Sequence, residues 1–124
     1  MAALSLLAEH CVPDTQSVID EGHLKKMTLG DQSLEREVLE IFARQTTLML
    51  GRFVGAEPLR AAALAHTLKG SARGVGAWRV ARATEQLEHA AGRCDGEALG
   101  EAFSQLEAAC IEVREVIEAR LGLS

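Results

Sequence analysis

The feature that most constrains this chain is a run of apolar residues that returns every three or four positions near the C-terminus. Its members are Leu99, Phe103, Leu106, Cys110, Val113 and Ile117. Alternating steps of four and three place them on one side of an α-helix, in a seam of about 3.5 residues per turn. A helix with such a seam must bury it against neighbouring helices, and we expect those neighbours to be antiparallel.

Capping signals predict a brief helix before the long ones. Asp20 is a helix-capping residue, Leu24 and Met27 follow as apolar positions, and Gly30 ends the pattern. We expect residues 1–19, which precede this helix, to form a tail or one short helix.

A long helix is predicted next, capped by Asp31 or Ser33 and ended by Gly55. Glu35 and Glu37 suit its N-terminal turn, where the helix dipole favours negative charge. The apolar residues that we expect to face the core are Leu34, Val38, Ile41, Phe42, Leu48, Met49 and Phe53.

Two further helices are predicted before the C-terminal one. The first begins near Pro58, because proline lacks an N–H and fits the first helical turn, and reaches about Gly74. The second covers about residues 78–91, and a turn over 92–96 follows, in which Asp95 caps the last helix. The core positions of the 78–91 helix are Val80, Ala83, Leu87 and Ala90.

These elements predict an all-α protein, namely an antiparallel up-and-down four-helix bundle with a short additional N-terminal helix. The chain has 124 residues, which suits one domain, and we assign that domain to residues 20–122.

Charge and composition exclude several classes of partner and location. The net charge is −5 and there are only four aromatic residues, so we expect no nucleic-acid partner. We expect no membrane association, because no stretch approaches the roughly 20 apolar residues of a spanning helix. Three cysteines without a C-x-x-C pair favour a reducing compartment, and the N-terminal run lacks a basic leader, so the expected location is the cytoplasm.

Chemistry is indicated on the helix that starts near Pro58. Its core stripe consists of Ala61, Leu64, Ala65, Leu68 and Ala72. His66 lies roughly 150° from the centre of that stripe, at 100° per residue. Around His66 the outer face carries small or apolar residues, Leu59, Ala62 and Ala63, where a solvent-facing helix usually carries Glu, Lys and Gln. The face therefore resembles a docking surface.

Three residues that follow His66 suit an anion on its ring. Gly70 costs about 1 kcal/mol relative to alanine inside a helix, but it leaves room beside the imidazole for a bulky group or a partner. Lys69, three positions on, brings an ammonium near the ring, and Arg73 adds a longer reach. An exposed imidazole is largely neutral at pH 7 and offers a nucleophilic nitrogen. The pattern favours a histidine that accepts and returns a phosphoryl group.

The run Ala65-His66-Thr67-Leu68-Lys69-Gly70-Ser71-Ala72-Arg73, followed by Gly76-Ala77, resembles the signature of histidine-containing phosphotransfer (HPt) domains of multistep phosphorelays. The resemblance extends over about residues 20–121. It implies that His66 is phosphorylated at Nε2, that Lys69 stabilises the phosphoryl group and that Gly70 keeps the site open. Gly74 departs from the family, in which many members carry Asn at that position.

The resemblance also implies the partners. A receiver domain of a response regulator donates the group from an aspartyl phosphate, another receiver accepts it, and a hybrid sensor histidine kinase stands upstream. We expect Mg²⁺ on the receiver and no cofactor on this chain, because no carboxylate cluster accompanies His66 in the sequence. We expect a monomer, since the His66 face must be free to dock. The chain is then a phosphotransfer carrier without kinase activity of its own, as neither nucleotide-binding glycine pattern is present.

Less specific interpretations fit some of the same residues. A helical adaptor could bind receivers or partner helices through Leu59, Ala62 and Ala63 without accepting phosphate, and a small bundle enzyme is a weaker third alternative. Glu85 and Glu88 are interpreted as a solvent-exposed edge of their helix. The remaining histidines are interpreted as surface or structural residues, and Met27, Met49 and Trp78 as packing residues.

Overall fold

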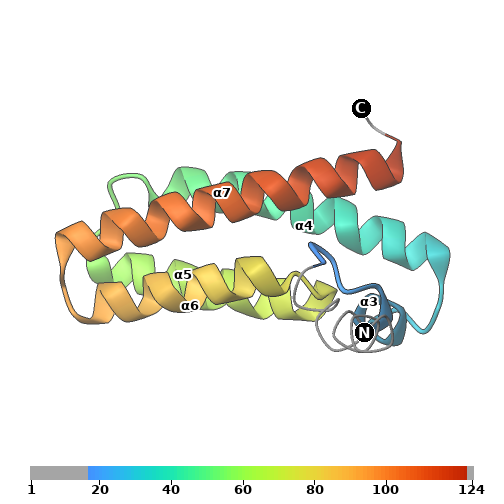
Figure 1. The fold of residues 1–124 in the computed structure, drawn as a ribbon, viewed down its shortest axis with the longest axis horizontal. Helices are drawn as coiled ribbons and strands as arrows, with labels where there is room; N and C mark the ends of the chain where they lie inside the picture. The colour runs from blue at the N-terminus through green and yellow to red at the C-terminus, as the bar shows by residue number, and fades with distance from the viewer. Residues whose placement is uncertain (1–16, 123–124) are drawn as a thin grey trace, which may run out of the picture.

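The computed structural model describes residues 17–122, which form five α-helices. These are α3 (Glu21–Met27), α4 (Gln32–Phe53), α5 (Pro58–Val75), α6 (Trp78–Gly92) and α7 (Gly96–Leu121). Successive long helices run in opposite directions (Figure 1), each packs on its neighbour in sequence, and α7 also packs on α4. The short α3 lies at one end of the bundle and contacts α5. The predicted antiparallel four-helix bundle with a short N-terminal helix is confirmed.

A tail or short helix was predicted over residues 1–19. Residues 1–16 of this segment, which include His10 and Cys11, lie outside the described residues. Of the residues just before α3, Ile19 is buried in the core and Val18 packs against it. The core thus includes side chains immediately ahead of residue 20, and the domain boundary at that residue stays a prediction.

Three aspartates cap helices; Asp20 and Asp95 were predicted to do so, and Asp31 is the cap where the sequence left Asp31 and Ser33 open. Asp20 accepts a hydrogen bond from the backbone N–H of His23 at 3.1 Å, and Asp31 accepts one from Leu34 at 3.1 Å. Asp95 accepts from two backbone N–H groups at the start of α7, at 3.1 and 3.2 Å. These bonds satisfy backbone donors that have no partner within their own helix, and so they define where α3, α4 and α7 begin.

The core is built from the seam of α7 and from small residues on the central helices. Leu106, Cys110, Val113 and Ile117 are buried, and Leu99 and Phe103 are half-buried. Burial raises the pKa of the Cys110 thiol to about 12, so this side chain packs as a neutral group. Alanines are frequent among the buried residues of α5 and α6, two helices that pack on each other; they include Ala61, Ala65, Ala72, Ala81 and Ala83.

The predicted core face of α4 is partly wrong. Phe42, Met49 and Phe53 are buried and Val38 is half-buried. The other three predicted core residues lie on the surface, Leu34 at 39%, Ile41 at 54% and Leu48 at 62% exposure. The inward positions are Glu35, Leu39, Phe42, Thr46, Met49 and Phe53.

Two polar residues explain the error, because they occupy inward positions of α4. Arg120 donates a hydrogen bond from Nη2 to Glu35 Oε1 at 2.9 Å, and the hydroxyl of Thr46 donates to the carbonyl oxygen of Ala43 at 2.7 Å. With these partners both side chains can be buried at low cost. The apolar residues Leu34, Ile41 and Leu48, spaced seven apart, therefore form an exposed stripe.

The start of α3 is joined to the start of α6. Trp78 is half-buried, donates from Nε1 to Asp20 Oδ2 at 2.8 Å, and meets the ring of His23 edge-on at 5.0 Å between centroids. The packing roles predicted for Trp78 and Met49 are confirmed. That predicted for Met27 is wrong, because 57% of this residue is exposed.

Candidate functional site

Helix α5 presents His66 on the surface of the bundle. Ala61, Ala65, Leu68 and Ala72 face the core and are buried, whereas Leu64 is half-buried. The side chain of His66 is 73% exposed. The sequence-based placement of this histidine away from the core stripe is therefore correct, and its ring is accessible to a second protein.

The surroundings of His66 on α5 are small and open. Leu59 is 85% exposed, Ala63 is exposed and Ala62 is half-buried. Gly70 is exposed as well, and a Cβ added there would meet no other atom within 4 Å. No neighbour within the described structure requires a glycine at this position, so the space beside the imidazole is available to an incoming group.

Lys69 is not a free cation on this face. Its Nζ donates a hydrogen bond to Oε1 of Glu88, on α6, at 2.9 Å, and only 16% of its side chain is exposed. The interpretation of Glu88 as a solvent-exposed edge is wrong, since its side chain is 29% exposed and lies against the His66 face. The hydrogen bond from Lys69 lowers the pKa of the Glu88 carboxyl, against an opposing effect of burial. Glu88 is thus a carboxylate at neutral pH.

The second oxygen of Glu88 faces the ring of His66. Oε2 lies 3.3 Å from Nδ1 of the imidazole. A carboxylate can only accept, so this contact is a hydrogen bond when Nδ1 carries the proton. In that tautomer Nε2 carries the lone pair, and Nε2 is the nitrogen that the contact leaves unengaged. Glu88 therefore favours the ring form with a nucleophilic Nε2.

Arg73 makes a second bridge from α5 to α6. Its Nη2 donates to Oε1 of Glu85 at 2.9 Å, with half of each side chain exposed. The two pairs follow a pattern that sequence reasoning missed. The cations stand four apart on α5 and the carboxylates three apart on α6, which matches two antiparallel helices in contact.

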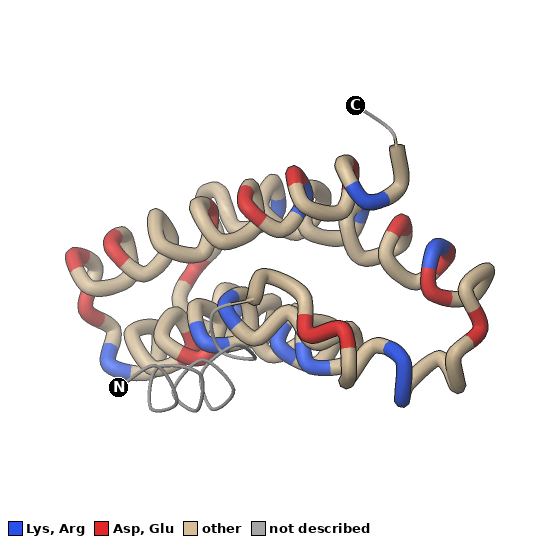
Figure 2. The backbone as a smooth tube through the Cα atoms, turned by 45° about the vertical axis from the view of Figure 1, so that its right-hand side comes forward, with Lys and Arg blue, Asp and Glu red and all other residues tan. Residues whose placement is uncertain are grey.

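The site lies on the most cationic long helix. Arg60, Lys69 and Arg73 give α5 a formal charge of +3, because it contains no Asp or Glu. Helix α7 has six Glu and two Arg, a formal charge of −4, and Figure 2 shows acidic residues repeated along it. Helix α5 thus contributes only cations to the site, and two of them, Lys69 and Arg73, are paired with glutamates of α6.

A shallow groove of about 210 Å³ separates α5 from α4. It is lined by Val38, Ile41, Phe42, Gln45, Ser71 and Val75. Ile41 belongs to the exposed stripe of α4, and Ser71 follows His66 by five residues on α5. The groove is therefore formed by α4 and by the side of α5 that lies about 140° round the helix from His66.

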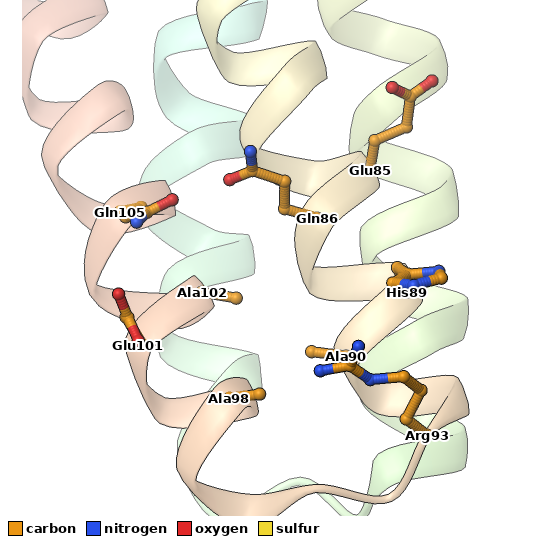
Figure 3. Close-up of a pocket in the computed structure, with 9 residues that line it drawn as sticks. All are labelled: Glu85, Gln86, His89, Ala90, Arg93, Ala98, Glu101, Ala102 and Gln105. Atoms are coloured by element: carbon orange, nitrogen blue, oxygen red, sulfur yellow. The ribbon is translucent and has the colours of Figure 1, made fainter.

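A larger groove, with a volume of about 580 Å³, lies elsewhere, between α6 and α7. Figure 3 shows its polar lining, with Gln86 and His89 on α6 and Arg93 just after that helix, opposite Glu101 and Gln105 on α7. His66 is not among its lining residues. Within residues 17–122, no group of three His, Cys, Asp or Glu side chains could hold a metal ion. No helix in that range is both long and apolar enough to span a bilayer.

Comparisons with known proteins agree with this geometry. No curated protein sequence matches the chain significantly. A rice protein named as a histidine-containing phosphotransfer protein has a similar X-ray structure, with a TM-score of 0.78, 20% sequence identity, and coverage of 98% of this chain and 94% of that one. At this identity the likeness shows the shared fold. The Hpt domain model matches residues 32–116, which include all of α5 and α6. The chain therefore belongs to the Hpt domain family, whose members act with response-regulator receiver domains in phosphorelays.

Proposed function

We propose that this chain accepts a phosphoryl group on Nε2 of His66 from the aspartyl phosphate of one receiver domain and passes it to another. The observation that carries the proposal is the exposed ring of His66. Its Nδ1 lies 3.3 Å from Glu88, and its Nε2 is left unengaged. The helix that carries this ring has a formal charge of +3.

The chemistry needs little from the carrier beyond a positioned nucleophile. The lone pair of Nε2 forms the N–P bond while the O–P bond of the aspartyl phosphate breaks, and the aspartate leaves as a carboxylate. The ring, which keeps its Nδ1 proton, becomes a cation that faces the Glu88 carboxylate. Catalysis then depends on alignment and on charge stabilisation. Lys69 is placed to neutralise part of the added charge of about −1.5 to −2.

The receiver docks on a surface that we define as Leu59, Ala62, Ala63, Arg73, Ile41 and Leu48. Exposed apolar residues next to an exposed nucleophile fit a partner that excludes water from the transfer step. Gly70 allows that partner to approach the imidazole. Docking here leaves the α6–α7 side uncovered.

The remaining components belong to the partners. Mg²⁺ is expected on the receiver, and the chain is expected to bring no cofactor of its own. A hybrid sensor histidine kinase upstream and a second response regulator downstream complete the proposed relay. The chain has no kinase activity of its own in this scheme, and it acts as a monomer in the cytoplasm.

The deciding experiment is ³¹P NMR of the protein after incubation with a phosphorylated receiver domain. A phosphohistidine signal that is labile in acid and stable in alkali is expected for the wild type and absent for His66→Gln. His89→Gln is the matched control, because His89 is an exposed histidine on α6 outside the docking surface. Retention of the signal in His66→Gln would assign the phosphate to another residue.

The alternative is an adaptor that binds receivers through the same surface without accepting phosphate. Binding of several receivers by calorimetry, without a phosphohistidine signal from any of them, would favour it. Sedimentation equilibrium tests the proposed monomer in the same samples, and a stable dimer would contradict that part of the proposal.

A further inference from the structure

We infer that Glu88 competes with the phosphoryl group for Lys69, and thereby keeps the phosphorylated state of His66 from becoming too stable to pass on. This inference rests on the proposed function. Glu88 is a positioning residue here, since it acts through Lys69 and not on the transferred group.

Two ion pairs join a cation of α5 to a glutamate of α6 near His66, and the one between Lys69 and Glu88 is the better buried. The side chains are 16% and 29% exposed, against 53% for both members of the Arg73–Glu85 pair. The separation of 2.9 Å is that of a charge-assisted hydrogen bond. The Lys69 ammonium, which should pair with the phosphoryl group on His66, is therefore already bound to Glu88 when His66 is unmodified.

The same carboxylate also lies beside the phosphoryl acceptor. One oxygen of Glu88 contacts Lys69 and the other lies 3.3 Å from the imidazole of His66. A phosphoryl group on this ring would thus lie near a cation that another anion already binds. An ammonium has three donors but a single charge, so each anion that it contacts weakens its attraction for the other.

The consequence concerns the equilibrium of transfer. If Lys69 were free, phosphorylation of His66 would form a new charge-assisted hydrogen bond between Lys69 and the phosphoryl group. The full free energy of that bond would then hold the phosphoryl group on His66. With Glu88 present, part of that gain is offset by the loss of the existing pair. A carrier that must release its phosphoryl group to a second receiver benefits from this smaller gain.

A double-mutant cycle tests the competition. The quantity is the equilibrium ratio of phosphorylated carrier to phosphorylated receiver, measured by ³¹P NMR in wild type, Glu88→Gln, Lys69→Gln and the double variant. We expect Glu88→Gln to raise the ratio by about three- to fivefold, the effect of one partly screened ion pair. In the Lys69→Gln background the same substitution should change the ratio by less than about 1.5-fold.

The Glu88→Gln substitution keeps a side-chain oxygen that can accept from Nδ1, so it removes the charge and not the ring contact. Glu112→Gln is the control for loss of a carboxylate from an ion pair, because Glu112 pairs with Arg79 at 2.8 Å and lies on α7. It should leave the ratio unchanged. Thermal unfolding of each variant verifies that the bundle is intact.

An unchanged or lower ratio in Glu88→Gln would overturn the inference. An equal increase in both Lys69 backgrounds would overturn it as well, because Glu88 would then act directly on the ring or the phosphoryl group. If wild-type protein takes no phosphate from any receiver that it binds, the proposed function fails and this inference fails with it. If the wild type is phosphorylated but Glu88→Gln leaves the equilibrium ratio unaltered, this inference is refuted while the proposed function stands.

Discussion

Trp78 donates a hydrogen bond from its indole Nε1 to Oδ2 of Asp20 over 2.8 Å, and 58 positions separate the two residues in the chain. The same carboxylate caps α3 by accepting from the backbone of His23. Asp20 therefore joins the short N-terminal helix to the first turn of α6, and its loss should affect two elements together.

We predict that Asp20→Ala destabilises the protein by about 2–3 kcal/mol, from a lost cap of about 1 kcal/mol and an indole N–H left without its acceptor. Asp31→Ala is the matched control, since Asp31 caps α4 through a single exposed bond and should cost only about 1 kcal/mol. Urea unfolding followed by circular dichroism measures both. Equal losses would mean that the Trp78 bond adds nothing.

The contribution of Asp20 should depend on pH. The hydrogen bond from Trp78, together with the backbone bonds at the start of α3, lowers the pKa of its carboxyl below the ordinary value, despite some burial. A carboxyl with a lowered pKa stabilises the fold above its unfolded-state pKa of about 3.9, and this stabilisation is lost as the pH falls further. The difference in unfolding free energy between wild type and Asp20→Ala should therefore shrink below about pH 4. A constant difference from about pH 7 to about pH 2 would contradict this.

Gly76 is predicted to tolerate no side chain. It ends α5 with φ of 80°, and an added Cβ would lie 3.0 Å from the backbone oxygen of Asp20. Gly55→Ala separates the cost of the positive φ from the cost of the steric clash, because Gly55 has φ of 74° but no atom within 4 Å of its Cβ position. We expect about 1–2 kcal/mol for Gly55→Ala and about 1–3 kcal/mol more for Gly76→Ala, measured by thermal unfolding. Similar values would show that the chain before α3 moves aside readily.

Gly70→Ala should stabilise the fold and slow the reaction. Alanine is favoured over glycine within a helix by up to about 1 kcal/mol, and nothing within 4 Å obstructs the new methyl. The methyl would hold a docked receiver away from His66, and we expect transfer to slow by about tenfold through loss of alignment. Gly100→Ala on α7, equally unobstructed, should give the stabilisation without slower transfer. Unchanged transfer in Gly70→Ala would remove the access role of Gly70.

The exposed stripe of α4 gives a prediction about docking. Ile41→Lys should weaken receiver binding by about tenfold in calorimetry, because an apolar contact at the interface would be replaced by a charge. The fold should be retained, since Ile41 is 54% exposed. Ile111→Lys on α7 is the control, because Ile111 is 44% exposed and lies outside the docking surface. Equal effects of both substitutions would exclude a specific role for α4.

Local patterns were sufficient for the helices and for the nucleophile. Aspartate caps and Pro58 set helix starts through backbone groups within a few residues, so Asp20 and Asp95 could be predicted as caps and Asp31 as one of two candidates, with Ser33. The buried seam of α7 could be predicted from the sequence because all its members are apolar. His66 was found on the exposed face because its position relative to the core stripe depends only on the helical repeat.

The inward face of α4 could not be read in this way. Glu35 and Thr46 point inward because Arg120 and the Ala43 carbonyl satisfy them, while Ile41 is left outside. A prediction from hydrophobicity alone places Glu35 and Thr46 on the surface and Ile41 in the core, the opposite of what the structure shows. Whether a polar side chain can be buried depends on its partners, and the partner of Glu35 comes from a distant helix.

The chain by itself thus determined the class of fold, the ends of the helices and the exposed histidine, because each follows from interactions within a few residues. Only the tertiary structure decided that Glu88 lies 3.3 Å from the His66 ring and holds Lys69. That contact requires a particular register between α5 and α6. Register is determined by the packing of the whole interface, since no single turn of either helix contains the information.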